Sequence, residues 1–232
     1  MDQLNPMFHE HSSDGHLTKE ERSSKSMKAK VDKMPLDQPD LWGRTKEDIA
    51  IQRLQEYEPE DGYYVAFSGG KDSVVLLTLV EKAGVKYDAH FRVVGGVDPP
   101  EAIRYIKDVW VPRGVSMEFP VDPWNPEKRL TMWSLIEQKL APPTKGRRFC
   151  CFYLKEPGGD GRVVVTGVRW EESFNRRSRR VVESCYNNGR GRMFVNPIID
   201  WTEQDVWDYI EQENIPRPPL YGEPVTLNGE PL

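Results

Sequence analysis

The feature that most constrains the fold is a glycine-rich turn between two apolar runs, VAFSGGKDSVVLL, at Val65 to Leu77. The run before the turn, YYVAF at 63–67, is short and continuously apolar, as in a buried parallel strand. The run after it, SVVLLTLVEKAG, is predicted to be a helix ending at Gly84, since glycine is common just beyond helix ends. A strand that turns directly into a helix indicates an α/β fold.

The same alternation continues along the chain to residue 215. Further strands are predicted at 87–94, 115–121 and 162–168, and further helices at 45–57, 99–110, 130–140 and 202–215. Thr45 and Thr202 are the expected N-caps of the first and last of these helices. The order predicts an α/β domain with a parallel twisted sheet and helices on both faces, a Rossmann-like architecture.

Composition sets the boundaries of this domain. Residues 1–40 are polar and predict a disordered tail, 41–215 a single folded domain, and 216–232 a C-terminal tail. His9, His11 and His16 in the first tail are interpreted as solvated residues, because no cysteine or carboxylate cluster completes a metal site beside them. We predict no metal site formed by the chain itself.

Charge and cysteine content narrow the class of protein further. The formal net charge of −5 argues against a general binder of polyanions. The three cysteines, two of them adjacent, do not form a disulfide framework and favour a reducing compartment. No apolar stretch approaches the roughly 18 residues of a membrane span, and the first thirty residues lack a signal-peptide core. We expect a cytoplasmic protein without membrane contact.

The glycine turn does not match two familiar phosphate-binding loops. A Walker A loop needs glycine where this chain has Val65, and serine or threonine where it has Asp72. A dinucleotide fingerprint needs separated glycines, whereas Gly69 and Gly70 are adjacent.

The turn nevertheless favours an anionic ligand. Glycines allow backbone N–H groups to approach a phosphate, and a helix N-terminus carries positive partial charge. Ser68 and Ser73 add hydroxyl donors and Lys71 adds a charge, while Asp72 is a candidate helix cap.

A basic segment from Arg169 to Arg192 contains seven arginines and three glutamates. Arg169 follows the predicted strand 162–168, at the edge of the sheet where α/β proteins bind ligands, and is predicted to hold an oxyanion through its planar fork. For Arg176 and Arg177, the sequence favours ligand contact and a position in a solvated loop equally. The remaining arginines are read as solvated, with contact to a nucleic-acid backbone as the alternative.

Five motifs in this order resemble those of phosphoadenosine phosphosulfate (PAPS) reductase-like proteins, in the adenine nucleotide α-hydrolase-like (PP-loop) superfamily. They are SGGKDS at 68–73, VDPPEAIRYI at 97–106, RRFCCFYLK at 147–155, TGVRWEESFNRR at 166–177 and NPIIDWTEQDVWDYI at 196–210.

The resemblance implies an enzyme of sulfur metabolism that binds an adenine nucleotide: ATP, adenylyl sulfate or PAPS. It implies phosphate binding at Ser68, Gly69, Gly70, Lys71, Asp72 and Ser73, and at Arg169, Glu172, Ser173, Arg176 and Arg177. Lys71, Asp72 and Arg169 are the expected catalytic residues. The reaction is either sulfonucleotide reduction, as in an oxidoreductase, or adenylation with pyrophosphate release, as in a transferase, the second with Mg²⁺.

The cysteines depart from the resembled family. Its iron–sulfur branch joins an adjacent pair to a later Cys-x-x-Cys, but this chain has only Cys185 besides Cys150 and Cys151. Four thiolates are needed for such a cluster, so none is expected from this chain alone, and the pair stays a redox or cluster candidate. Family reductases carry a nucleophilic cysteine in a C-terminal tail. Residues 222–232 hold none, so we expect a truncated or divergent tail and no reduction by the isolated chain.

A second hypothesis gives the chain no chemistry of its own. It would be the nucleotide-binding subunit of a complex that transfers sulfur to DNA or RNA. Its partner protein would supply the cysteines, and the segment 169–192 would contact the nucleic acid.

Overall fold

The computed structural model describes residues 35–185, 191–221, 226–227 and 230–231. Most of the tail predicted at 1–40 lies outside these residues. The described helices are α2 (Lys46–Glu56), α3 (Lys71–Ala83), α4 (Pro100–Tyr105), α5 (Met132–Lys139) and α6 (Glu203–Gln212). The main sheet contains β1 (Tyr63–Phe67), β2 (Tyr87–Arg92), β3 (Val115–Glu118), β6 (Val163–Val165), β7 (Val182–Cys185) and β8 (Arg192–Val195).

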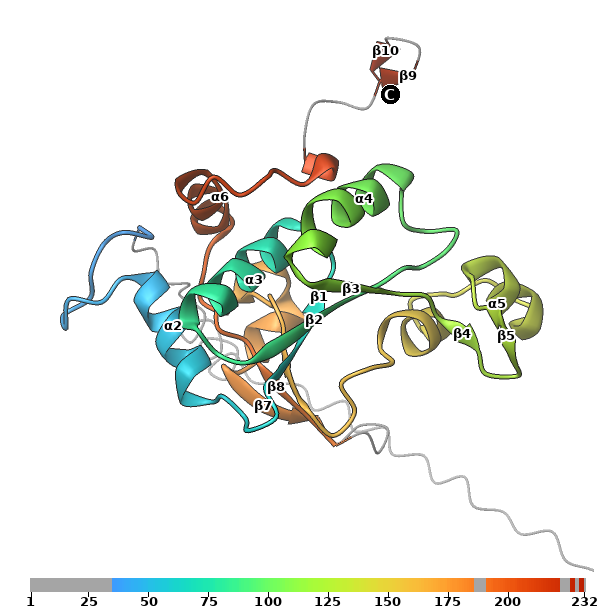
Figure 1. Ribbon diagram of the computed structural model, residues 1–232, viewed down its shortest axis with the longest axis horizontal. Coiled ribbons are helices and arrows are strands. Elements are labelled where there is room, and N and C mark those ends of the chain that lie inside the picture. The colour runs from blue at the N-terminus through green and yellow to red at the C-terminus, as the bar shows by residue number, and fades with distance from the viewer. Residues whose placement is uncertain (1–34, 186–190, 222–225, 228–229, 232) are drawn as a thin grey trace, which may run out of the picture. The chain divides into compact units, whose positions relative to one another are not determined.

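The sheet has the order β3-β2-β1-β6-β8-β7 (Figure 1). Every neighbouring pair is parallel except β7 with β8, which is antiparallel at the edge. The mostly parallel α/β sheet predicted from the sequence is therefore confirmed, with one reversed edge strand. Because parallel strands end at the same edge, the loops after β1, β2 and β6 meet there.

The two faces of the sheet are covered unevenly. On one face, Val65 lies beside Ala89 and Val165, and each of these side chains is at most 1% exposed. This face packs with residues of α2, α3 and α6 in one core cluster. On the other face, Tyr64, His90 and Arg92 are only partly buried. The helices expected on both faces thus cover chiefly one of them.

Local signals in the sequence explain where the helices begin and end. The Thr45 hydroxyl accepts a hydrogen bond from the backbone N–H of Asp48, and the Asp48 carboxylate accepts one from the backbone N–H of Thr45; Thr202 forms the same capping box with Asp205. Helix α3 ends at Gly84, whose φ of 67° lies in the left-handed region. The predicted boundaries of these helices are confirmed to within a few residues.

Other segments differ from the prediction. The helix expected at 99–110 is α-helical only to Tyr105, continues as a π-helical turn at Ile106–Trp110, and closes with a 3₁₀ turn at Val111–Arg113 that ends at Gly114, whose φ is 96°. A hairpin of β4 (Val121–Asp122) and β5 (Asn125–Arg129) was not predicted. Order also begins before Leu41, because Leu36 is 6% exposed and belongs to the core.

The segment that follows α6 lies against α4. The hydroxyl group of Tyr105 donates to the carbonyl oxygen of Pro216 at 2.6 Å, and Pro219–Tyr221 forms a 3₁₀ turn. The pairs Thr226–Leu227 (β9) and Glu230–Pro231 (β10) are antiparallel. Among the described residues, no helix combines the length and apolar character needed to cross a membrane.

Candidate nucleotide-binding site

The 68–73 loop lies at the carboxyl end of β1 and leads directly into α3. Gly69 has a φ of 73°, a conformation that side chains disfavour, and a Cβ there would lie 2.6 Å from Cδ1 of Ile106. Gly70 has an ordinary φ of −80° and serves as the N-cap. A Cβ on Gly70 would lie 3.5 Å from the hydroxyls of Ser68 and Tyr221, an ordinary contact. Gly69 therefore shapes the turn, whereas Gly70 leaves room for a small side chain beside Ser68 and Tyr221.

Two hydroxyl groups hold the loop closed. Ser68 Oγ donates to Ser73 Oγ at 3.1 Å, and Ser73 Oγ donates to the carbonyl oxygen of Gly70 at 2.8 Å. The helix cap predicted at Asp72 is wrong, because the helix begins one residue earlier and Asp72 sits in its first turn. Within the described residues, the backbone N–H groups of Lys71 and Asp72 have no acceptor. Such groups at a helix N-terminus are ready donors for an anion.

Asp72 and Arg169 meet across 97 positions of sequence. Nε of Arg169 donates to Oδ1 of Asp72 at 2.6 Å, and its Nη1 lies 3.3 Å from Glu171 Oε2. The Arg169 side chain is only 3% exposed. The sequence thus located Arg169 at the correct edge, but its guanidinium is already paired with carboxylates and does not present an open fork. It fixes the first turn of α3 to the segment after β6.

Lys71 begins α3 and its side chain is largely buried. Its Nζ is 3.4 Å from Asp72 Oδ2 and 3.7 Å from Glu203 Oε1, and it lies 5.1 Å from the centre of the Tyr221 ring. The ammonium is therefore surrounded by residues of α6 and of the C-terminal turn as well as by the loop.

The other predicted residues of the basic segment form a compact turn beside Arg169. Glu172 accepts from the backbone N–H of Arg169 at 3.0 Å and pairs with Arg176, while Ser173 accepts from the backbone of Arg176. Burial lowers the pKa of Arg176, and the charges of Arg179 and Arg169 lower it further against the pull of Asp72. Arg177 is exposed. Glu172 and Ser173 therefore stabilise the turn through these bonds.

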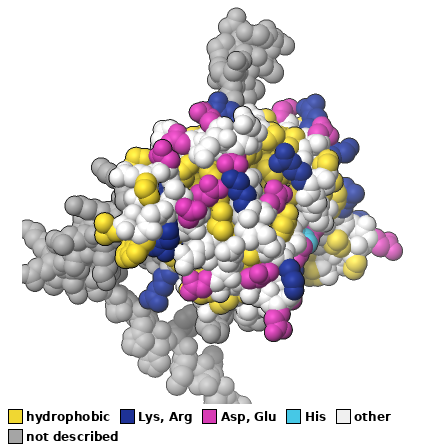
Figure 2. Space-filling model, turned by 60° about the vertical axis from the view of Figure 1, so that its left-hand side comes forward, with side chains coloured by type: hydrophobic (Ala, Val, Ile, Leu, Met, Phe, Trp, Pro, Cys, Tyr) yellow, Lys and Arg dark blue, Asp and Glu magenta, His cyan; other side chains and the backbone are white. Residues whose placement is uncertain are grey.

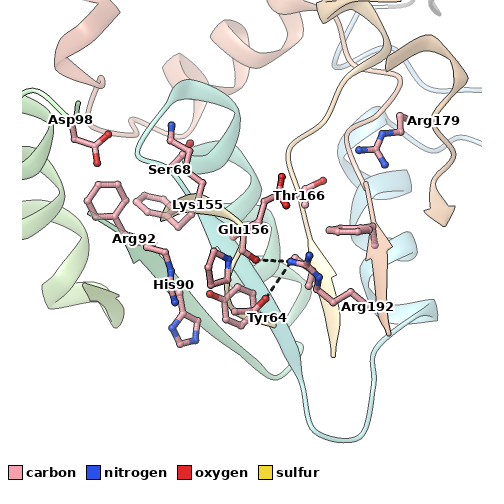
Figure 3. A pocket seen from close by; sticks show the side chains of 17 residues that line it. Tyr64, Ser68, His90, Arg92, Asp98, Lys155, Glu156, Thr166, Arg179 and Arg192 are labelled. Carbon is pink, nitrogen blue, oxygen red and sulfur yellow. Dashed lines mark hydrogen bonds between the residues drawn. The ribbon is translucent and has the colours of Figure 1, made fainter. Parts of the chain in front are cut away.

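A pocket of about 550 Å³ opens on the less covered face of the sheet, next to Ser68 (Figure 3). Its lining comes from β1, β2, β6, β8 and the segment 155–158. Most strand residues in the lining alternate, as expected for one side of a sheet, and Phe67 and Phe91 near the carboxyl ends of β1 and β2 also reach it. The polar members of the lining are Tyr64, Ser68, His90, Arg92, Asp98, Lys155, Glu156, Thr166, Arg179 and Arg192.

Four cations from separate elements surround this pocket. Arg92 bonds to Glu118 at 2.9 Å, and Arg179 to Glu183 at 2.5 Å. Arg192 donates to the carbonyl oxygen of Glu156 at 2.8 Å, one of the bonds drawn in Figure 3. Lys155 is exposed. The lining also contains the carboxylates of Asp98 and Glu156, so its four cations outnumber its acidic residues by two, which favours an anionic ligand.

The floor of the pocket is a network around His90. Its Nδ1 lies 2.7 Å from Glu118 Oε1, and its Nε2 contacts Asp88. Tyr64 stacks on the imidazole with ring centres 4.4 Å apart, and Arg162 pairs with Asp88 at 2.6 Å. Burial raises the pKa of Tyr64 to about 12, so its hydroxyl stays protonated at neutral pH. Two carboxylates therefore hold the imidazole in one orientation.

The cysteine pair lies beside the pocket lining in sequence but not in it. Cys150 precedes the π-helical turn Cys151–Lys155, whose last residue, Lys155, lines the pocket. Both thiols are partly buried and free, and Arg148 approaches Cys151 Sγ at 3.5 Å. Burial raises the pKa of Cys150, and neighbouring Cys151 adds to the effect. The backbone of Cys185 belongs to β7.

The donor set of the site does not form a ready metal centre. Across the described parts of the chain, no three His, Cys, Asp or Glu side chains gather as a metal site. Asp72, the carboxylate of the loop, is engaged by Arg169 and Lys71. We therefore derive no step through Mg²⁺ or an iron–sulfur cluster.

Sequence reasoning missed much of the pocket. The sequence favours a packing role for His90 and solvated positions for Arg179 and Arg192, and it does not single out Arg92 and Lys155. Arg92 could have been found, because it ends a strand and shares the face of His90. Lys155 and Arg192 line the pocket because the fold brings their segments together, and local sequence patterns do not encode that arrangement.

Loop, sheet edge and pocket together define an α/β protein whose candidate ligand site lies beyond the carboxyl ends of parallel strands. The family model of the phosphoadenosine phosphosulfate reductase domain matches residues 62–226. The chain belongs to this family.

Relatives and solved structures agree with this assignment. An adenosine 5'-phosphosulfate reductase of Neisseria meningitidis is 39% identical over 82 residues, covering 33% of each chain. A sulfate adenylyltransferase subunit 2 of Methylorubrum extorquens is 48% identical over 80 residues, covering 25% of this chain and 26% of the relative. The chain spans about a third of the length of the curated relatives it matches first.

The crystal structure of a phosphoadenylyl-sulfate reductase from Candida auris, in complex with phosphate, covers 88% of this chain and 91% of its own, with a TM-score of 0.51 and 16% identity. At that identity the likeness concerns the fold. The two relatives named above are a sulfonucleotide reductase and a subunit of a sulfate adenylyltransferase.

Proposed function

We propose that this chain is an enzyme that binds an adenine sulfonucleotide or ATP, with phosphates on the 68–73 loop and the rest of the ligand in the adjoining pocket. The single observation that carries the proposal is the continuity of the two features. Ser68 belongs to the loop and also lines the pocket, where four cations converge. A nucleotide that carries phosphate at one end and further charge along its length matches that distribution.

Each residue has a distinct task in this proposal. The free N–H groups of Lys71 and Asp72 bind a phosphate, and Lys71 adds its charge. Arg169 acts as a positioning residue, because it orients Asp72 and the first turn of α3. Lys155 and Arg192 bind the more distant anionic group, while Tyr64 and Phe194 provide ring surfaces along the pocket. Arg176 and Arg177 add positive charge at the neighbouring turn.

Two reactions of such a nucleotide are consistent with the family. In reduction, a thiol attacks the sulfur of the sulfonucleotide, and the nucleotide leaves. In adenylation, an oxyanion attacks the α-phosphorus of ATP, and pyrophosphate leaves. Burial, with Cys151 beside it, raises the pKa of Cys150, so its surroundings do not activate this thiol as a nucleophile.

The test has two stages. Thermal unfolding is followed with ATP, adenylyl sulfate, PAPS and adenosine bisphosphate, because a ligand that binds only the native state raises the melting temperature. Sulfite release with thioredoxin and pyrophosphate release from ATP plus sulfate are then measured. No shift with any of the four nucleotides contradicts the proposal. A shift without turnover instead supports a nucleotide-binding subunit that acts with a cysteine-bearing partner.

A further inference from the structure

We propose that the surface formed by the β4–β5 hairpin, α5 and the turn at 145–153 binds single-stranded nucleic acid. We call it the hairpin–α5 surface. It lies apart from the labelled strands β1 and β8 in Figure 1, on the side of α5. The inference goes beyond the proposed nucleotide chemistry and does not depend on it. It also concerns a different segment from the arginine-rich 169–192.

Large aromatic rings are exposed on this surface. Trp124 in the hairpin is 59% exposed, Trp133 on α5 is 70% exposed, and Phe119 before the hairpin is 42% exposed. The Trp133 ring lies against the backbone of Gly96, where a Cβ would be 2.7 Å from its Nε1. One side of this indole is thus held by the protein while most of it is exposed. A ring held in this way provides a platform on which an unpaired base can stack.

Cations lie directly beside these rings. The guanidinium of Arg129 is 4.0 Å from the centre of the Phe119 ring. Lys139 Nζ is 5.1 Å from the centre of the Trp124 ring and 4.7 Å from that of Tyr153. This interleaving of positive charge with aromatic rings suits a strand whose phosphates and bases alternate.

The local charge favours a polyanion. Residues 119–148 contain six lysines and arginines but three acidic residues, in a chain of net charge −5. One of the three, Asp122, is buried and bonded to Gln138 and to the backbone of Trp124, so it does not oppose an approaching phosphate. Lys128, Lys145, Arg147 and Arg148 are exposed. By contrast, the face shown in Figure 2 mixes acidic and basic side chains.

Trp42 provides an internal comparison. It is 77% exposed and lies 5.3 Å from Arg44, so it also forms an exposed pair of ring and cation. Arg44, however, is bonded to Asp40, and further acidic residues follow in the first turn of α2. A ring and a cation are present there without a positive field around them. Trp42 is therefore a matched control.

The experiment measures fluorescence anisotropy of a labelled oligothymidylate with the full chain at about 50 and about 200 mM salt. We expect binding that weakens steeply with salt and exceeds binding to a duplex of equal length. Trp124→Ala should weaken the binding at least about fivefold, because base stacking is removed. Lys128→Gln with Arg129→Gln should reduce the slope of log affinity against log salt by about 0.7 for each phosphate that the protein no longer neutralises.

The controls separate this proposal from its rivals. Trp42→Ala should leave the affinity unchanged, and thermal melting checks that each variant is folded. If Trp124→Ala unfolds the protein, the double variant Lys128→Gln with Arg129→Gln still tests the proposal, because both residues are exposed. No binding at low salt would overturn the proposal, as would equal losses of affinity in the Trp42 and Trp124 variants. Binding abolished only by Arg177→Ala with Arg180→Ala would assign nucleic acid to the other segment. Self-association of the protein through the hairpin–α5 surface, unaffected by salt, would identify this surface as a protein interface instead.

Discussion

The two faces of the main sheet use the same strands for different purposes. In β1, Tyr63, Val65 and Phe67 point into the core and are at most 4% exposed, whereas Tyr64 and Ala66 between them border the pocket. In β2, Ala89 and Phe91 are buried, and His90 and Arg92 line the pocket. The period of two thus separates most residues that stabilise the fold from residues available to a ligand, although the buried rings of Phe67 and Phe91 also reach the pocket lining. Mutations on the two faces should therefore affect different measurements.

The largest expected effect is on stability, from the covered face. Leu76 of α3 is fully buried within the core that packs against this face. Leu76→Ala should lower the free energy of unfolding by about 2–5 kcal/mol, because it removes apolar packing and leaves a cavity. Denaturant titration measures the change. Ala66→Ser on the open face is the control and should change stability by less than about 0.5 kcal/mol; comparable losses of stability would show that both faces are structural.

A complementary effect is expected in the pocket. Lys155→Ala should weaken binding of adenylyl sulfate or PAPS by about 1.5–3 kcal/mol, because it removes a charged hydrogen bond to the ligand. Stability should be unchanged, since Lys155 is exposed. Calorimetric titration gives the affinity, with Lys145→Ala as an exposed control outside the pocket. If both variants weaken binding equally, the lysines act only as a general positive field.

The two glycines of the loop sharpen the comparison within one turn. Gly69→Ala should destabilise the protein by about 1–2 kcal/mol, because its left-handed φ of 73° disfavours a side chain. Gly70→Ala should be tolerated by the fold, since its Cβ meets nothing closer than 3.5 Å. Thermal melting of both variants distinguishes the positions. Equal destabilisation would mean that the strain lies elsewhere in the turn.

The smallest effect concerns pH. Burial alone would raise the pKa of Asp88, but hydrogen bonds from Arg162 and His90 outweigh it and lower the pKa below its ordinary value of 3.8. The carboxylate therefore contributes stability above that value, and the contribution disappears as pH falls through the lower, folded-state pKa. In the Asp88→Asn variant, the free energy of unfolding should decrease less steeply as the pH falls into the acid range. An unchanged acid profile would contradict this account.

The sequence predicted the architecture well because its signals are local. Thr45, Thr202 and Gly84 mark helix ends, and YYVAF marks a buried strand, so the alternation that defines the fold is visible without tertiary information. It also brought Arg169 to the edge that carries the loop. What it could not give was the state of that arginine, since its pairing with Asp72 depends on a contact across 97 positions.

The pocket was predictable only in part. Ser68 was found through its motif, but the convergence of Lys155, Arg179 and Arg192 depends on how three distant segments cross the sheet. The short strands β7 and β8 were missed because the arginines and glutamates of that segment mask its alternation.

The central claim is that loop and pocket bind one and the same nucleotide. Calorimetric titration of adenylyl sulfate into the wild type, Gly70→Val, Lys155→Ala and the double variant tests it directly. The Gly70→Val side chain should obstruct the approach of phosphate to the loop, while Lys155→Ala removes a cation from the pocket. The account predicts one saturable site that both single variants weaken. If either single variant binds adenylyl sulfate with wild-type affinity, loop and pocket do not share a ligand, and the claim is contradicted.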